Sequence, residues 1–446
     1  MEKERIEIER AVLENLAGKI LLLQDPLGKR EVIFQAFLEV YNSPRAQKFV
    51  KRCKDLNMDK FFQEFLSYGL IEEFLADPDI EDIMINYLSP IYIHKTRVGM
   101  IKTDKAFSSR EELDLLIKKL IIFSGRKAIN KINNVELSGA KGRVNIIYSP
   151  FGPQITITRA KERILNIVDL IKSGTINAEL AAQFWLYVEG LGIKPANIII
   201  SGGPGTGKTT LLNALFGFMP SNQRIVVIED TLELNTDLEE NCSRLESDDE
   251  ITLADLVKNS LRMRPDRVIV GEVRGKEALD LMTAMNIGKF CMGTLHASTP
   301  RETIMRLENE PMNVPEVLIN LVDVFVIMRR YNVEGKIKRV VGELAETAGM
   351  EDKQVLLSAL WTYDLSKLDF HESAVSSVYR DRVALVSGRS SKDIIGELKL
   401  RTRIIKALVE KDISDSRRLA ELFRRYSHDP HPVINELGLK EESPRY

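Results

Sequence analysis

The sequence predicts an α/β protein with a mainly parallel sheet, and three observations support this fold class. Between about residues 166 and 340, short apolar and β-branched runs alternate with stretches at helical spacing. The runs are apolar throughout, which is typical of strands covered by helices on both faces. Polar residues and glycines follow directly after them, at the strand ends where such sheets bind ligands. The expected strands are NIIIS, RIVVIED, RVIVGE, CMGTLH and VFVIMRR.

The rest of the chain divides around this region. Residues 1–60 have apolar positions near helical spacing and predict a helical extension. Residues 61–165 contain short strands and one long helical stretch, and predict a small α+β domain. Residues 341–446 predict a mostly helical region after a weakly β-like start. We therefore expect four parts, with the α/β domain at 166–340.

Composition excludes several classes of protein. The formal net charge of −2 over 446 residues gives no bulk attraction to nucleic acid. The three cysteines have neither disulfide-framework nor zinc-knuckle spacing. The sequence begins with a charged stretch unlike a signal peptide, and it lacks an apolar run of the roughly 18 residues that cross a bilayer. We expect a cytoplasmic protein whose contact with a membrane depends on a partner.

A glycine-rich motif begins where the first apolar strand ends. Residues 202–209 read GGPGTGKT, which matches G-x-x-x-x-G-K-[ST] between a strand and a helix. Such a loop binds phosphate through its backbone N–H groups, its lysine and the helix N-terminus. A glycine-rich turn with an incidental lysine is the structural alternative. The residues expected to bind nucleotide are Gly203, Pro204, Gly205, Thr206, Gly207, Lys208, Thr209 and Thr210.

Acidic residues and one histidine follow three further strands. Glu229, Asp230 and Glu233 come after the second strand, Glu272 after the third, and His296 after the fourth. Taken singly, Glu272 reads equally well as a solvated carboxylate, and His296 as a histidine satisfied at a strand end. Their repetition at strand ends downstream of one phosphate loop predicts a hydrolytic site.

The third strand raises a question, because Gly271 and Glu272 stand where an aspartate that holds magnesium is usual. RPDRVIVGEVRG, IEDTLEL and GTLHAS resemble the Walker B, Asp and His boxes of the secretion ATPase superfamily, which drives type II secretion, type IV pili and the archaellum. LADPDIEDIMINYLSPIYIHK and GAKGRVNIIYSPFGPQITITR resemble that superfamily's N-terminal domain. The resemblance covers about residues 60–335 and implies a RecA-like ATPase domain preceded by a PAS-like domain.

The resemblance also implies roles for the residues. Glu272 activates the attacking water, His296 senses the γ-phosphate, and Glu229 belongs to the catalytic set. Thr209, Asp230 and Glu233 contact Mg²⁺. Arg143 and Arg159, on strands of the N-terminal domain, match arginines that reach the nucleotide. The alternative is that both are surface arginines on strands, without a role in nucleotide binding. Arg264 and Arg274 flank the Walker B strand and are weaker candidates.

The implied activity is hydrolysis of ATP by a homohexamer that acts on a polytopic membrane platform protein. The C-terminal helices and EPMNVPEVLIN are similar to archaeal members, which favours an archaellum or pilus motor. Two departures stand out: Ile287 and Lys289 replace the residues usual before the His box. A RecA-like nucleic-acid motor is the alternative, although a basic groove and stacking aromatics are not evident in the sequence.

Overall fold

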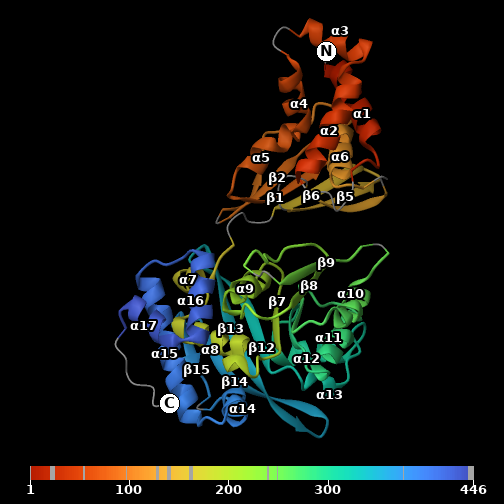
Figure 1. Ribbon diagram of the computed structural model, residues 1–446. Coiled ribbons are helices and arrows are strands. Elements are labelled where there is room, and N and C mark those ends of the chain that lie inside the picture. The colour runs from red at the N-terminus through yellow and green to blue at the C-terminus, as the bar shows by residue number, and fades with distance from the viewer. Residues whose placement is uncertain are drawn as a thin grey trace. The chain divides into compact units, whose positions relative to one another are not determined.

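The computed structural model describes residues 2–20, 26–53, 56–96, 98–126, 130–137, 142–159, 164–238, 241–248, 250–374 and 376–439. Contacts between Cα atoms divide the chain into two compact units, residues 1–163 and 164–446 (Figure 1). Each unit is described by itself, and the four-part division expected from sequence stays a prediction.

Unit 1 combines helices with one six-stranded sheet. The strand order is β3-β2-β1-β6-β5-β4, and every neighbouring pair is antiparallel. In chain order the elements are α1 (Glu2–Leu16), α2 (Pro26–Tyr41), α3 (Pro44–Arg52), α4 (Met58–Leu66), η1 (Gly69–Ile71), α5 (Glu72–Ala76), β1 (Ile80–Asn86), β2 (Ile91–Lys95), β3 (Gly99–Lys102), α6 (Arg110–Phe123), β4 (Ile132–Glu136), β5 (Gly142–Ser149) and β6 (Gly152–Arg159).

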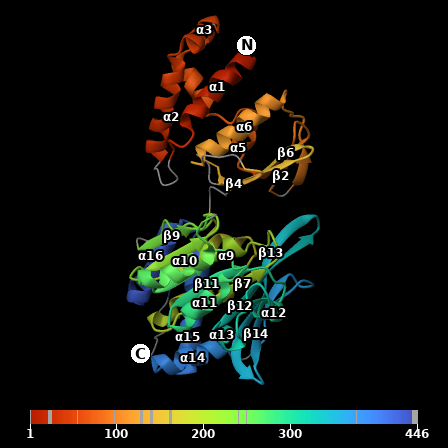
Figure 2. The same cartoon turned by 90° about the vertical axis from the view of Figure 1, so that its right-hand side faces the viewer.

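The helices of unit 1 cover one face of its sheet (Figure 2). Alternate residues such as Ile83 on β1 and Ile157 on β6 point into the core and are fully buried. Aromatic side chains of the N-terminal helices, among them Phe37 and Phe61, belong to the same core. Helices α1 to α4 thus share one core with the sheet. The comparison of this unit with a PAS domain stays a prediction.

Unit 2 contains a nine-stranded sheet and most of the helices. Its elements are α7 (Ile167–Lys172), α8 (Ala178–Glu189), η2 (Gly190–Gly192), β7 (Ile198–Gly202), α9 (Lys208–Leu215), η3 (Phe216–Phe218), β8 (Ile225–Glu229), β9 (Cys242–Glu246), α10 (Leu253–Ser260), η4 (Leu261–Met263), β10 (Arg267–Val270), α11 (Glu277–Asn286), β11 (Phe290–Leu295), α12 (Pro300–Glu308), α13 (Glu316–Ile319), β12 (Val324–Val333), β13 (Lys336–Glu351), β14 (Gln354–Asp364), β15 (Asp369–Glu372), α14 (Val378–Ser387), α15 (Ser391–Glu410), α16 (Ser416–His428) and α17 (Pro430–Leu437).

The sheet of unit 2 is mixed. Its order is β15-β14-β13-β12-β7-β11-β10-β8-β9; all neighbours from β12 to β9 are parallel, whereas β12 to β15 pair antiparallel. A hydrophobic core lies on each face of this sheet, and successive strand residues pack into one or the other. Ile198 and Ile200 belong to one core and Ile199 to the other. Burial on both faces explains the continuous apolar runs. The α/β class is confirmed, with antiparallel strands added at one edge.

The C-terminal stretch differs in detail from its sequence-based description. Strands β13 to β15 continue to Glu372, and helices begin at Val378. The buried Arg401 of α15 pairs with Glu189 of α8 at 2.5 Å, and its guanidinium lies over the ring of Trp185 at 4.6 Å. The final helices are therefore anchored to the helical layer of the same unit.

Within the part of the chain that the structure describes, none of the helices combines the length and the apolar character needed to cross a membrane.

Candidate nucleotide-binding and hydrolysis site

The order of the parallel strands gathers the predicted residues at one edge of the sheet. Strand β11 lies between β7, which leads into the glycine-rich loop, and β10, which precedes Glu272. Strand β8, which ends at Glu229, lies on the other side of β10. Because the four strands are parallel, their carboxyl ends meet at the same edge.

The glycine-rich loop joins β7 to α9 in the conformation that its sequence predicts. Gly207, the residue before α9, has a φ of 96°, which is in the left-handed region open to glycine. The hydroxyl of Thr206 donates to the carbonyl of Gly203 at 2.8 Å and closes the loop on itself. Thr209 and Thr210 lie half-buried in the first turn of α9. Loop and helix N-terminus together form the usual cradle for a phosphate.

Lys208 lies inside this loop with its ammonium turned toward backbone carbonyls. Its Nζ donates to the carbonyls of Gly202 at 3.0 Å and Gly203 at 3.1 Å. Burial lowers the pKa of Lys208, while the Glu272 carboxylate opposes that shift. A phosphate oxygen is a stronger partner for the ammonium than a neutral carbonyl. The lysine is thus placed to exchange these carbonyls for a bound anion.

A histidine connects the carboxylate of Glu272 to Lys208. The Nε2 atom of His296 lies 2.7 Å from Oε1 of Glu272, and Nδ1 lies 3.2 Å from both Nζ of Lys208 and the Gly202 carbonyl. The Glu272 carboxylate can only accept, so Nε2 carries the proton of a neutral ring, and Nδ1 then accepts from the Lys208 ammonium. The side chains of Glu272 and His296 are 26% and 37% exposed, so water has access to them.

The presence of glycine at position 271 has a steric explanation. A Cβ atom added to Gly271 would lie 2.8 Å from Cγ of Glu229, so the neighbouring glutamate occupies the space that an aspartate side chain would need. Glu229 is 2% exposed, and its Oε1 accepts the N–H groups of Glu233 and Leu234 at 2.9 and 3.0 Å. The Glu229 carboxylate therefore shapes the loop that follows β8.

Asp230 and Glu233 lie on that loop. Oδ2 of Asp230 accepts from Arg274 at 2.6 Å, so the weaker candidate Arg274 contacts the acidic box directly. Among the described residues, no group of three or more His, Cys, Asp or Glu side chains is arranged to hold a metal. Mg²⁺ at nucleotide sites takes one or two protein oxygens, with phosphate oxygens and water as its other ligands. The Thr209 hydroxyl and the carboxylates of Asp230 and Glu233 are oxygen ligands of the kind that suits such an ion.

Arg143 and Arg159 belong to unit 1. Arg143 lies on β5 opposite Glu136 and Thr158 in the strand register. The guanidinium of Arg159 donates to the carbonyls of Asp77 and Ile80, at 3.2 Å for the latter. Arg159 thus ties the end of β6 to the segment leading into β1. A role for either arginine toward nucleotide stays a prediction.

Two arginines of unit 2 lie beside the glycine-rich loop although the sequence did not single them out. Nε of Arg339 donates to the Gly205 carbonyl at 2.8 Å. Arg330 approaches the same glycine, with Nη1 3.7 Å from the place of an added Cβ. Both stand on the hairpin formed by β12 and β13. The basic pattern MRRYNVEGKIKR was the available signal.

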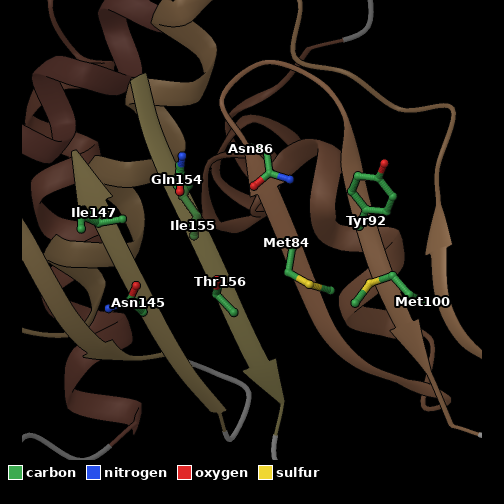
Figure 3. A pocket seen from close by; sticks show the side chains of 9 residues that line it. All are labelled: Met84, Asn86, Tyr92, Met100, Asn145, Ile147, Gln154, Ile155 and Thr156. Carbon is green, nitrogen blue, oxygen red and sulfur yellow. The ribbon is translucent and has the colours of Figure 1, made fainter. Parts of the chain in front are cut away.

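A separate hollow of about 400 Å³ lies on the sheet of unit 1 (Figure 3). Figure 3 shows the side chains on neighbouring strands, with Asn145 and Ile147 of β5 at one end of the row and Met100 of β3 at the other. All nine lining residues are uncharged. Phosphate recognition relies on cations and clustered N–H donors, so this hollow lacks the chemistry found at the glycine-rich loop.

Comparisons with known proteins agree with this geometry. Residues 131–339 match the family described as type II/IV secretion system protein. The uncharacterized protein MJ0900 of Methanocaldococcus jannaschii is 31% identical over 376 residues, which cover 80% of this chain and 68% of that protein. The probable conjugal transfer protein TrbB of Sinorhizobium fredii is 30% identical over 269 residues, covering 57% of this chain and 81% of that protein.

The chain belongs to the type II/IV secretion system protein family. It is an ATPase of that family. Among solved structures, this family member is similar to the ATPase DotB of Legionella pneumophila. That similarity has 18% identity and a TM-score of 0.46, and it covers 81% of this chain and 94% of that one.

Proposed function

We propose that the chain is a homohexameric motor that hydrolyses ATP to drive an archaeal type IV pilus-like filament, an archaellum or a secretion system. In this proposal its ATPase domain is RecA-like, and it works at the cytoplasmic face of the membrane, on a polytopic platform protein. The observation that carries the catalytic part is the connected line from Lys208 through His296 to Glu272. Membership of the family supports the mechanical part.

The proposed reaction assigns a step to each of these side chains. Lys208 binds the β- and γ-phosphates in place of the Gly202 and Gly203 carbonyls. Glu272 takes a proton from water as the water oxygen attacks the γ-phosphorus, and ADP leaves with the electrons of the broken P–O bond. His296 orients Glu272 and contacts the γ-phosphate. Thr209, Asp230 and Glu233 would hold Mg²⁺, whose charge would offset that of the phosphates.

Lys208→Ala tests the nucleotide site in the full chain. Because the ammonium supplies the positive charge inside the loop, we expect loss of detectable ATP binding in calorimetry and loss of phosphate release. Lys258→Ala is the matched control, since the Lys258 side chain is 63% exposed on α10 and its ammonium pairs with Asp280. ATP affinity that is equal in Lys208→Ala and the wild type would remove the assignment.

The motor part of the proposal has a different test. Light scattering on purified protein with ATP and Mg²⁺ should give the mass of six 50.6 kDa chains, and a polytopic membrane protein should co-purify and raise the ATPase rate. A monomer that hydrolyses ATP at full rate alone would contradict the hexameric motor while leaving the ATPase assignment in place. Stimulation by DNA, falling with salt, would favour the nucleic-acid motor instead.

A further inference from the structure

The hairpin of β12 and β13 places two arginines opposite each other beside the glycine-rich loop. Its turn consists of Glu334 and Gly335, with φ angles of 51° and 78°. Positive φ at both positions is the geometry of the two-residue turn that matches the twist of a hairpin. Such a turn fixes the register, and Arg330 is paired with Arg339. The hairpin can be followed in Figure 2 at the label β13.

The neighbouring basic residues of the hairpin have partners elsewhere. Arg329 pairs with Glu343 at 3.3 Å, and the ammonium of Lys338 lies 5.3 Å from the centre of the Tyr363 ring. Arg330 and Arg339, on the alternate face, approach Gly205 instead. Within the described ranges of the chain, no carboxylate forms an ion pair with either of these two arginines.

Like charges directly opposite each other on an antiparallel pair destabilise the sheet. Two arginines opposite each other beside a phosphate loop therefore carry an electrostatic cost in the absence of an anion. A guanidinium presents a planar fork of N–H donors that suits phosphate oxygens. The chemistry of the pair thus fits a phosphate.

The strand order indicates which phosphate this is. Strand β7 has β11 and then β10 on one side, and β12 on the other. The γ-phosphate must lie toward His296 and Glu272, on the side of β11 and β10, and the loop itself surrounds the β-phosphate. The α-phosphate then lies on the side of β12.

We propose that Arg330 and Arg339 bind the α-phosphate end of the nucleotide and so set the affinity for ATP and ADP alike. This inference rests on the proposed function. Arg339 also holds the tip of the loop through the Gly205 carbonyl, whereas Arg330 has an exposed guanidinium ready for the ligand. Neither arginine takes part in proton transfer.

Arg330→Gln in the full chain tests the proposal by calorimetry with ADP and with ATP in Mg²⁺. Loss of one charge-assisted hydrogen-bonding group should raise both dissociation constants about tenfold. The kcat at saturating ATP should stay within about twofold of wild type, because the interaction is the same in ground and transition states. The melting temperature without nucleotide should not fall, because a like-charge contact is removed.

Lys338→Gln is the matched control, since it removes one positive charge from the same hairpin on the face away from the loop. It should leave the ADP affinity within about twofold of wild type. The proposal is overturned if Arg330→Gln and Arg339→Gln both bind ADP as wild type does, or if only ATP affinity falls. A wild-type chain that binds neither nucleotide would instead refute the proposed function.

Discussion

Glu229 and Glu272 stand at the ends of the neighbouring parallel strands β8 and β10, yet their surroundings are opposite. The Glu229 carboxylate is 2% exposed and accepts two backbone N–H groups of the loop after β8. The Glu272 carboxylate is 26% exposed and faces His296 at 2.7 Å. A strand-end position alone therefore does not define a role. The partners of each carboxylate separate the glutamate that shapes the site from the one available to water.

The largest effect is expected at Glu272. Glu272→Gln keeps the size of the side chain but removes its basicity, so we expect kcat to fall at least about 10²-fold. ATP affinity should persist, because Lys208 and the loop are intact. Phosphate release and calorimetry measure the two quantities. Wild-type turnover in this variant would move the water-activating role to another residue.

Glu229 should respond mainly in stability. Glu229→Ala leaves the N–H groups of Glu233 and Leu234 without their acceptor, which we expect to lower the free energy of unfolding by about 2–3 kcal/mol. Glu272→Ala, at a partly exposed contact with His296, should cost less than about 1 kcal/mol. Urea unfolding followed by circular dichroism compares the two. If Glu272→Ala were the more destabilising change, the contrast between the two strand ends would be wrong.

The smallest of these effects is expected at His296, the partner that distinguishes Glu272 from Glu229. His296→Ala removes a contact proposed for the γ-phosphate alone, so the dissociation constant for ATP should rise about tenfold while that for ADP stays unchanged. Arg330→Gln should weaken the binding of both nucleotides. Together the two variants therefore separate contacts to the α-phosphate end of the nucleotide from contacts to its γ-phosphate. Equal losses for ATP and ADP in His296→Ala would show that the histidine does not sense the γ-phosphate.

Much of the site was predictable because of one geometric rule. Polar residues that follow parallel strands meet at one edge, so Lys208, His296 and Glu272 can be grouped from the sequence alone. The glycine-rich motif also predicts the left-handed backbone at Gly207, the residue before α9. These features depend on short segments, whose spacing is visible in the chain.

Other features depend on packing between distant segments. The position of the Glu229 side chain beside Gly271 is not visible in the sequence, because it requires the register of β8 against β10. The approach of Arg339 to Gly205 likewise depends on a hairpin more than a hundred residues further along the chain. The antiparallel edge of the sheet was missed because the pattern from residue 341 looks only weakly β-like.

The most direct test of the account is the structure of the full chain bound to Mg²⁺ and a non-hydrolysable ATP analogue. We expect the Lys208 ammonium to have left the Gly202 and Gly203 carbonyls for phosphate oxygens, with the Glu272 carboxylate within hydrogen-bonding distance of a water in line with the γ-phosphorus. A bound nucleotide with Glu272 directed to bulk solvent, and Glu229 or Asp230 next to that water, would contradict the assignment.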